Sequence, residues 1–324
     1  MSGTRSSAAA CLAALLFAIL PAKAEDYPTH PVTLVVPFPA GGGVDVVGRI
    51  VAEKLTAALG QQVVVDNRGG AAGVIGTRAV TKAAPDGYTL VMATSGSIAI
   101  NPNLYVNPGY VTLKDLSPIG SISSTPIVLM AHPSAAQQSL ADIIAAAKKE
   151  PGKLNIGTPP PGTSANLAAE LLKSAASIDF TIVTYRGTGP LTTDVLGGHV
   201  PHALNVLAPA VGHLKSGTLK ALAVLATKRS TLLPDVPTSA EAGLPSFEAG
   251  LTYGLLAPAG TPKPIIERLN KELRALIDTP EVRARIASDG GDPLPSTPEE
   301  YAADIQREDA KWGALIKKLK LKVE

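Results

Sequence analysis

The sequence predicts an α/β protein of two lobes, and three observations support this. Apolar stretches rich in β-branched residues alternate with stretches of helical periodicity, in two successive sets. A helical region follows the second set and needs a surface on which to pack. Roughly 300 residues remain once a leader is removed, which suits two domains better than one. We expect each lobe to be a mainly parallel sheet flanked by helices.

The first 24 residues have the three parts of a secretory signal peptide. Arg5 supplies the positive end, residues 8–20 form the apolar stretch, and residues 22–24 form an A-x-A cleavage site. The apolar run is shorter than the roughly 20 residues of a membrane helix, so we expect cleavage and export to the periplasm. Cys11 is the only cysteine, so the mature chain has no thiolate for catalysis or for zinc binding.

The mature chain is expected to carry no net charge. Loss of Arg5 and Lys23 lowers the number of lysines and arginines from 29 to 27, which equals the 27 aspartates and glutamates. No basic patch for nucleic acid is implied, and no second long apolar segment predicts a membrane span.

The first set of elements begins directly after the leader. Residues 32–38 form an apolar, β-branched strand, and residues 44–55 have apolar side chains at helical spacing. A second strand is expected at 62–67, a short helix at 76–83, and a third strand at 88–93. Such alternation is typical of parallel strands with crossover helices.

The second set repeats the pattern. Strands are expected at residues 127–131, 154–157, 180–185, 203–207 and 221–225, and helices at 140–149, 164–174 and 191–196. After a proline-punctuated loop at 232–243 and a strand at 251–257, helices are expected at 265–277, 280–288 and 298–319. The chain thus leaves one lobe and returns to it, with lobe 1 at 25–125 and 250–324 and lobe 2 at 126–249.

The glycine cluster after the first strand, within VVPFPAGGGVDVVGRI at residues 35–50, resembles a phosphate-binding loop but lacks its chemistry. Arg49 and Ile50 stand where a P-loop needs lysine and a hydroxyl, and Val46 occupies a glycine of the dinucleotide motif. Two interpretations remain. The glycines at 41–43 either let the backbone bind an anion at the helix start, or form a plain turn with Asp45 as helix cap.

Two further turns at strand ends are rich in hydrogen-bond donors. Residues 94–97 read TSGS, and residues 158–164 read TPPPGTS. Alone, Thr163 or Ser164 would be an ordinary helix cap. Because open α/β sheets bind ligands beyond the carboxyl ends of their strands, the three turns together are a candidate ligand site.

Catalytic and metal-binding patterns are poor. The sequence has no G-x-S-x-G and no H-E-x-x-H motif, and the pair His199 and His202 is separated by a proline that breaks any helix. An enzyme that uses Asp45 or Asp194 as a base remains the alternative to a binding protein. The basic C-terminal end, residues 317–322, is interpreted as a solvated helix face.

Several longer segments together resemble one family. They are VVPFPAGGGVD at residues 35–45, DNR at 66–68, AAPDGYTL at 83–90, AINPNLY at 99–105, PGKLN at 151–155, YRGTGP at 185–190 and YGLLAPAGTP at 253–262. In these segments, spread over nearly all of the mature chain, the sequence is similar to the periplasmic substrate-binding receptors of tripartite tricarboxylate transporters, the Bug family.

The resemblance implies a two-lobed, type II flytrap fold that closes on a small carboxylated solute, with no cofactor and no metal. It implies a monomer that delivers the solute to the membrane components of a transporter; a sensory receptor would need the same closure. The residues implied to line the site are Phe38, Pro39, Ala40, Gly41, Gly42, Gly43, Asp45, Ser95, Gly96, Thr158, Thr163, Ser164, Thr188, Gly189 and Asn205.

The sequence departs from the usual family pattern at three places. Pro160 and Pro161 replace a flexible stretch and remove N–H donors. Asn166 stands where histidine is common, and Asn205 where many members have an aspartate that would pair with a ligand amine. The missing charge at Asn205 disfavours an amino-acid ligand.

Overall fold

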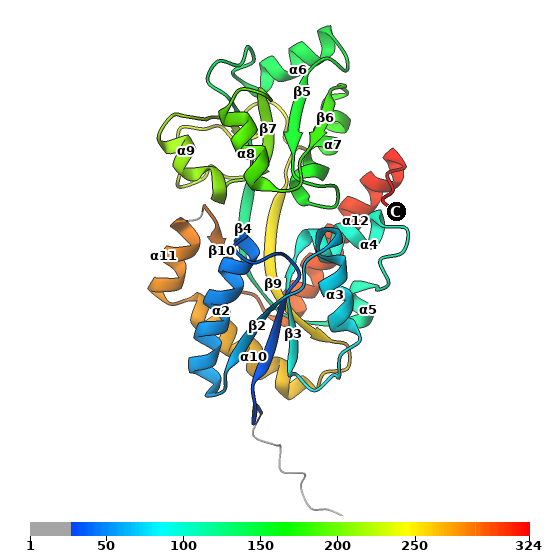
Figure 1. Cartoon of the computed structure of the whole chain (residues 1–324), viewed down its shortest axis with the longest axis vertical. Coiled ribbons are helices and arrows are strands. Elements are labelled where there is room, and N and C mark those ends of the chain that lie inside the picture. Colours follow the sequence, from blue (N-terminus) through cyan, green and yellow to red (C-terminus); the bar gives the residue numbers. More distant parts are fainter. Residues whose placement is uncertain (1–26, 289) are drawn as a thin grey trace, which may run out of the picture.

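The computed structural model describes residues 27–288 and 290–324, and the predicted leader at residues 1–24 lies outside them. Two lobes lie one above the other and are joined by two long strands (Figure 1). β4 (Leu116–Ala131) runs from the lower lobe into the upper lobe, and β9 (Gly250–Pro258) returns. This is the two-lobed α/β fold that the sequence predicts.

The lower lobe is built on the strand order β2-β1-β3-β9-β4. Its remaining strands are β1 (Val32–Val36), β2 (Val63–Asn67), β3 (Thr89–Thr94) and β10 (Asp292–Pro293). Its helices are α2 (Gly43–Leu59), α3 (Val74–Thr81), α4 (Asn101–Leu104), α5 (Thr112–Asp115), α10 (Lys263–Ile277), α11 (Pro280–Ser288) and α12 (Pro298–Leu319), with short turns η1 (Ala71–Gly73) and η2 (Gly96–Ile100).

The upper lobe continues the sheet through β4-β7-β5-β6, with β8 on the other side of β4. These strands are β5 (Asn155–Thr158), β6 (Thr181–Thr184), β7 (His202–Val206) and β8 (Lys220–Val224). The helices are α6 (Leu140–Lys149), α7 (Ser164–Ala176), α8 (Thr188–Leu196) and α9 (Val211–Lys215), with the turn η3 (Ala208–Ala210).

The expectation of mainly parallel sheets holds only for the outer strands. β1 pairs in parallel with β2 and β3, and β5 pairs in parallel with β6 and β7. β4 and β9 instead pair antiparallel with each other and with their other neighbours. The reason is the path of the chain: one strand leaves the lower lobe and the other comes back beside it.

β4 begins 11 residues earlier than the sequence indicates, at Leu116, since a strand is predicted only at residues 127–131. Pro118, Gly120 and Pro126 are residues that usually interrupt strands. The pairing with β9 shifts register between Pro118 and Gly120 and again between Ser121 and Ser123. These irregularities accommodate the proline and glycine while the strand continues.

The C-terminal helix α12, the predicted helical tail, packs against both lobes. Thr297 and Glu300 form a reciprocal capping box at its start. Tyr301 packs with lower-lobe strands, whereas the fully buried Trp312 joins a core that contains α7 of the upper lobe. Lys318 also donates to Ser174 Oγ of α7, at 2.9 Å. α12 therefore contacts both lobes, and the lobe boundaries given above stay a prediction.

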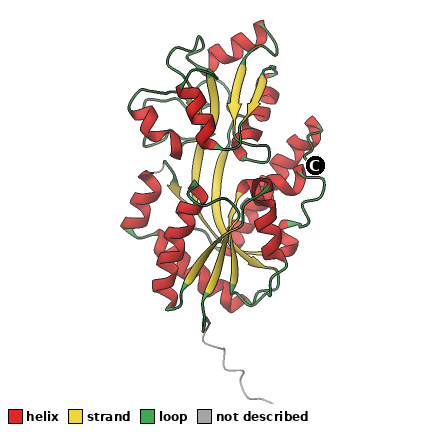
Figure 2. Cartoon of the chain, viewed as in Figure 1, coloured by secondary structure: helices red, strands yellow, loops and turns green. Residues whose placement is uncertain are grey.

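The parallel strands of the two lobes point toward each other. β5 and β6 run downward to the lower lobe, as their arrowheads show (Figure 2). β1 runs upward from the chain start at the bottom of the view (Figure 1). The helices that follow these strands, α2 in the lower lobe and α7 and α8 in the upper lobe, therefore all begin at the junction between the lobes.

Candidate ligand site between the lobes

The turn between β1 and α2 exposes main-chain donors. Residues 39–43 are exposed, and Gly41 has a φ of +83°, which favours glycine. α2 begins at Gly43 with Gly42 as its N-cap, and no side chain caps it. Because the first N–H groups of a helix have no partner within the helix, this start offers donors to a ligand.

The side chain of Asp45 stabilises this turn by hydrogen bonds. Its side chain is 3% exposed. Oδ2 accepts hydrogen bonds from the Gly41 N–H at 2.8 Å and from Arg49 Nε at 2.9 Å, and Oδ1 accepts one from Asn67 Nδ2 at 2.9 Å. Burial alone would raise the pKa of Asp45, but these hydrogen bonds from Arg49, Gly41 and Asn67 outweigh it and hold the pKa below its ordinary value.

This geometry corrects the capping interpretation and shows which groups of the turn are already bonded within the protein. Asp45 is the third residue of α2 and not its N-cap, so the simple capping interpretation is wrong. Its two oxygens are bonded within the protein, and the Gly41 N–H is bonded to Asp45. The donors that remain for a ligand are therefore those around Gly42 and Gly43.

Asn67 and Arg49 also belong to this turn, although neither is among the residues predicted to line the site. Asn67 Nδ2 also donates to Phe38 O at 3.2 Å, and Arg49 reaches Asn67 Oδ1 at 3.2 Å. Two signals were present: Asn67 ends the second parallel strand, and Arg49 lies four residues after Asp45, which is ion-pair spacing on a helix.

The second turn, at Ser95 and Gly96, touches the upper lobe. Ser95 Oγ lies 3.1 Å from Ser164 Oγ and accepts a hydrogen bond from Thr252 N at 3.3 Å. A methyl group on Gly96 would lie 3.0 Å from Gly162 O, so only glycine fits this approach without a shift. The structure thus brings together the predicted residues Ser95, Gly96 and Ser164, at a contact between the lobes.

The hydroxyl groups of the upper-lobe turn are bonded within the turn itself. Thr158 is fully buried, and its Oγ1 donates to Pro159 O and accepts from Asn166 Nδ2 at 2.9 Å. Thr163 Oγ1 donates to Pro160 O at 2.7 Å and accepts from Asn166 N at 3.3 Å, as a helix cap does. Both side chains shape the turn, and Asn166 connects them.

The start of α8 resembles the start of α2. Gly187 is its N-cap, no side chain caps it, and Gly189 is exposed. The Thr188 carbonyl accepts from Thr192 Oγ1 at 2.8 Å, one turn into the helix. In Figure 1 the starts of α2 and α8 lie on the facing sides of the two lobes. Two uncapped helix starts therefore face the junction.

Asn205 lies in β7, opposite Val128 of β4, and is fully buried. Its Oδ1 accepts from Val206 N at 2.9 Å. Its Nδ2 has no hydrogen-bond partner among the described residues. A neutral amide with an unused NH₂ group is thus present where the family resemblance expects an acid.

In residues 27–288 and 290–324, no group of three or more histidines, cysteines, aspartates and glutamates could hold a metal ion. Among the helices in those ranges, none combines the length and the apolarity of a membrane span. Asp194, the other candidate base, accepts a hydrogen bond from Tyr185 Oη at 2.8 Å.

Comparison with known families decides between the remaining classes. Residues 47–321 match the model of the tripartite tricarboxylate transporter family receptor. The chain belongs to this family. The resemblance noted in the sequence is confirmed, and this family consists of periplasmic solute-binding receptors and not of enzymes.

Individual relatives agree with the family assignment. The chain is 36% identical to BugT of Bordetella pertussis over 305 residues, 94% of each chain. It superposes on the periplasmic binding protein BugD with a TM-score of 0.81 and 34% identity, over 92% of this chain and 100% of that one. An R. palustris protein solved with adipate gives a TM-score of 0.84 at 33% identity, over 91% of this chain and 99% of that one. MatC from Rhodopseudomonas palustris, solved with bound malate, gives a TM-score of 0.81 at 32% identity, over 90% of this chain and 100% of that one.

Proposed function

We propose that this receptor captures a small organic carboxylate between its lobes and delivers it to the membrane components of a tripartite tricarboxylate transporter. One observation carries the proposal: the uncapped, exposed start of α2, whose glycine turn is held in place by Asp45. The N–H groups at a helix start carry about half a positive charge together, and they attract an anion without a cationic side chain.

The buried Asp45 would repel an approaching carboxylate if its charge were not balanced. Arg49 lies 2.9 Å from Asp45 Oδ2 and supplies the opposite charge. Arg49 itself is half exposed and lies along α2, so it neutralises Asp45 without occupying the glycine turn. The turn thereby presents donors to the ligand while the acid beneath it is already paired.

The second helix start indicates what kind of acid fits. α8 offers uncapped N–H groups from the upper lobe, as α2 does from the lower lobe. A dicarboxylate would place one end on each and draw the lobes together. The structures of relatives with adipate and with malate support this choice of ligand class.

The energy of such contacts is sufficient. A hydrogen bond to a charged group contributes about 1.5 to 3 kcal/mol, and micromolar binding requires about 8 kcal/mol. Four or so main-chain bonds shared by two lobes therefore account for useful affinity. The unused donor of Asn205 and the hydroxyls of Ser95 and Ser164 would complete the binding site.

We propose further that the receptor works as a periplasmic monomer after cleavage of residues 1–24. Its lobes would be residues 25–125 with 250–324, and residues 126–249. The family membership supports the periplasmic location.

The test is a ligand panel with matched uncharged analogues. Thermal unfolding of the mature chain is followed with adipate, malate and other mono- and dicarboxylates, and in parallel with their amides. We expect a saturable rise in melting temperature with at least one dicarboxylate and none with the corresponding diamide. Stabilisation by the amides, by neutral sugars or by amines, without any by the acids, would contradict the proposal.

A further inference from the structure

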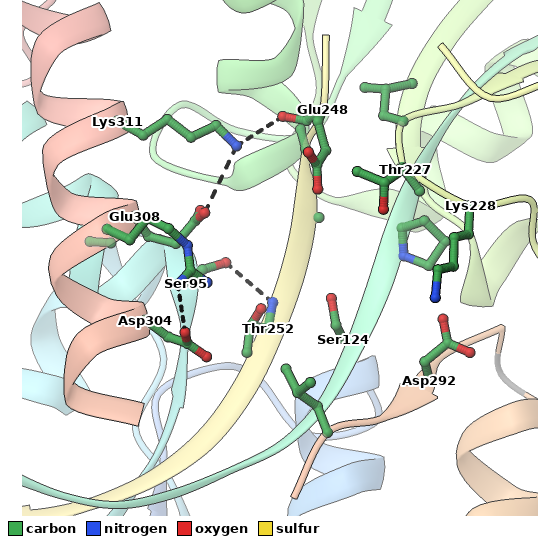
Figure 3. A pocket seen from close by; sticks show the side chains of 18 of the residues that line it. Ser95, Ser124, Thr227, Lys228, Glu248, Thr252, Asp292, Asp304, Glu308 and Lys311 are labelled. Atoms are coloured by element: carbon green, nitrogen blue, oxygen red, sulfur yellow. Dashed lines mark hydrogen bonds and ion pairs between the residues drawn. The ribbon is translucent and has the colours of Figure 1, made fainter. Parts of the chain in front are cut away.

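A crevice of about 320 Å³ lies at the hinge and is lined from both lobes. Its floor includes Ser124 of β4 and Thr252 of β9. Figure 3 shows Thr227, Lys228 and Glu248 pointing into it from the upper lobe, against the lower-lobe elements α12 and β10. Of the predicted ligand residues, only Ser95 lines it.

This crevice opens on the opposite face from the glycine turn. α12 lies on the left and β10 on the right in Figure 3, whereas Figure 1 shows them on the right and the left. The two pictures thus view the hinge strands from opposite sides. The starts of α2 and α8 lie in front of β4 and β9, and the crevice lies behind them.

Two of the connections between the lobes define an axis about which the lobes can turn. One is the pair of hinge strands, β4 and β9. The other is the packing of α12 on the upper lobe, through the buried Trp312 and Ile316. A rotation about an axis through both connections has opposite effects on the two faces: if the starts of α2 and α8 in front move apart, the crevice behind must narrow.

We infer that the crevice behind the hinge sets the affinity of the receptor, because the open state requires its walls to approach each other. A side chain that fills the crevice would oppose opening and raise the closed fraction of the ligand-free protein. Apparent affinity rises with that fraction, since only the closed state holds the ligand from both lobes. The inference rests on the proposed function only for its affinity readout.

Two pairs of residues face each other across the crevice. Lys311 of α12 donates to Glu248 O at 2.9 Å, which already links the lobes on this face. Lys228 and Asp292 point toward each other across the crevice, from the upper lobe and from β10 (Figure 3). Both are exposed, and their attraction favours a narrower crevice.

The first test fills the crevice with Thr227→Trp. Thr227 is exposed, so the change adds bulk on the crevice wall without disturbing a core. We expect the Kd for the best carboxylate, measured by titration calorimetry, to fall about tenfold, which corresponds to about 1.4 kcal/mol. Ser246→Trp, an exposed position outside the crevice, and Thr227→Ser are the controls and should leave the Kd unchanged.

The second test reverses charges. Lys228→Glu and Asp292→Lys should each lower the Kd about twofold, because like charges then oppose narrowing. The double variant Lys228→Glu/Asp292→Lys should return the Kd to the wild-type value. Single variants that raise the Kd, or a double variant that adds the two effects, would contradict the inference.

The third measurement needs no ligand. Spin labels on cysteines at Ala57 of α2 and Thr193 of α8, both exposed, report the distance between the lobes in a mature chain that has no other cysteine. Thr227→Trp should shift the ligand-free distance distribution toward shorter values, and Ser246→Trp should not. An unchanged distribution overturns the crevice inference even if carboxylates bind. Failure of all carboxylates to bind overturns the proposed function even if the distances shift.

Discussion

The main-chain donor at Gly43 can be removed by one substitution that suits the local backbone. Gly43 is the first residue of α2, a position where proline is favoured because its fixed φ is already helical. Gly42, with φ −81° and ψ 167°, is extended, as the residue before a proline should be. A β-carbon at Gly43 would lie 3.5 Å from Tyr253 Oη, an ordinary contact. Gly43→Pro thus deletes the N–H with little change of shape.

The expected loss follows from the bond that is removed. One hydrogen bond from a neutral N–H to a carboxylate contributes about 1.5 to 3 kcal/mol, so its loss raises the Kd between about tenfold and 150-fold. Gly43→Ala keeps the N–H and adds the same β-carbon, so it separates the donor from the bulk. We expect Gly43→Ala to bind within about twofold of wild type.

The assay is titration calorimetry of wild type, Gly43→Ala and Gly43→Pro with the best dicarboxylate, at one salt concentration. Melting temperatures of the ligand-free proteins verify that both variants fold. Equal Kd values for Gly43→Pro and Gly43→Ala would refute the claim that this donor holds the carboxylate. A loss of affinity that appears equally in both variants would assign the effect to the β-carbon instead.

Three further predictions concern the surroundings of the site. Asp45→Asn should lower the free energy of unfolding by about 1–3 kcal/mol in urea titrations, because the N–H₂ group of asparagine would replace an oxygen that accepts hydrogen bonds from Gly41, Arg49 or Asn67. Because the pKa of Asp45 is lowered on folding, its charge stabilises the protein above the unfolded-state pKa, so this difference should shrink as the pH falls below about 4. Gly162→Ala should lower the melting temperature and cost about 1–2 kcal/mol, because Gly162 has a φ of +87° and a β-carbon there would lie 2.5 Å from Asn101 Oδ1. Trp312→Ala should cost about 3–5 kcal/mol in urea, because the side chain fills the core that α12 shares with the upper lobe. Unchanged unfolding in any of these variants, or a gap between wild type and Asp45→Asn that widens toward low pH, would contradict the corresponding argument.

Most of the longer helices and strands were predictable because local patterns determine them, whereas the short elements α4, α5, α9 and β10 were not predicted. The helix at residues 298–319 is predicted with the same bounds that α12 has, since proline and the acidic first turn mark its start. β4 was predictable only at its upper end, residues 127–131. Residues 116–126 form a strand because β9 lies beside them, and that pairing is not encoded locally in a segment with two prolines and a glycine.

The site was predictable to the level of turns and not of atoms. Strand-end turns are recognisable in sequence, and the structure places the Oγ atoms of Ser95 and Ser164 3.1 Å apart. Which hydroxyls are already bonded within a turn depends on three-dimensional neighbours. The cap that Thr163 forms at the start of α7 is a local pattern and was predicted. The bond from Asn166 to Thr158 and the bond from Asn67 to Asp45 join separate elements, so they could not be foreseen.

The most direct test of the central claim is a crystal structure of the mature chain with the dicarboxylate that gives the largest thermal shift. We expect one carboxylate at the start of α2, within hydrogen-bond distance of the N–H groups of Gly42 and Gly43, with Asp45 still bonded to Gly41. A ligand held elsewhere, for example against Lys228 in the crevice behind the hinge, with the start of α2 occupied only by water, would contradict it.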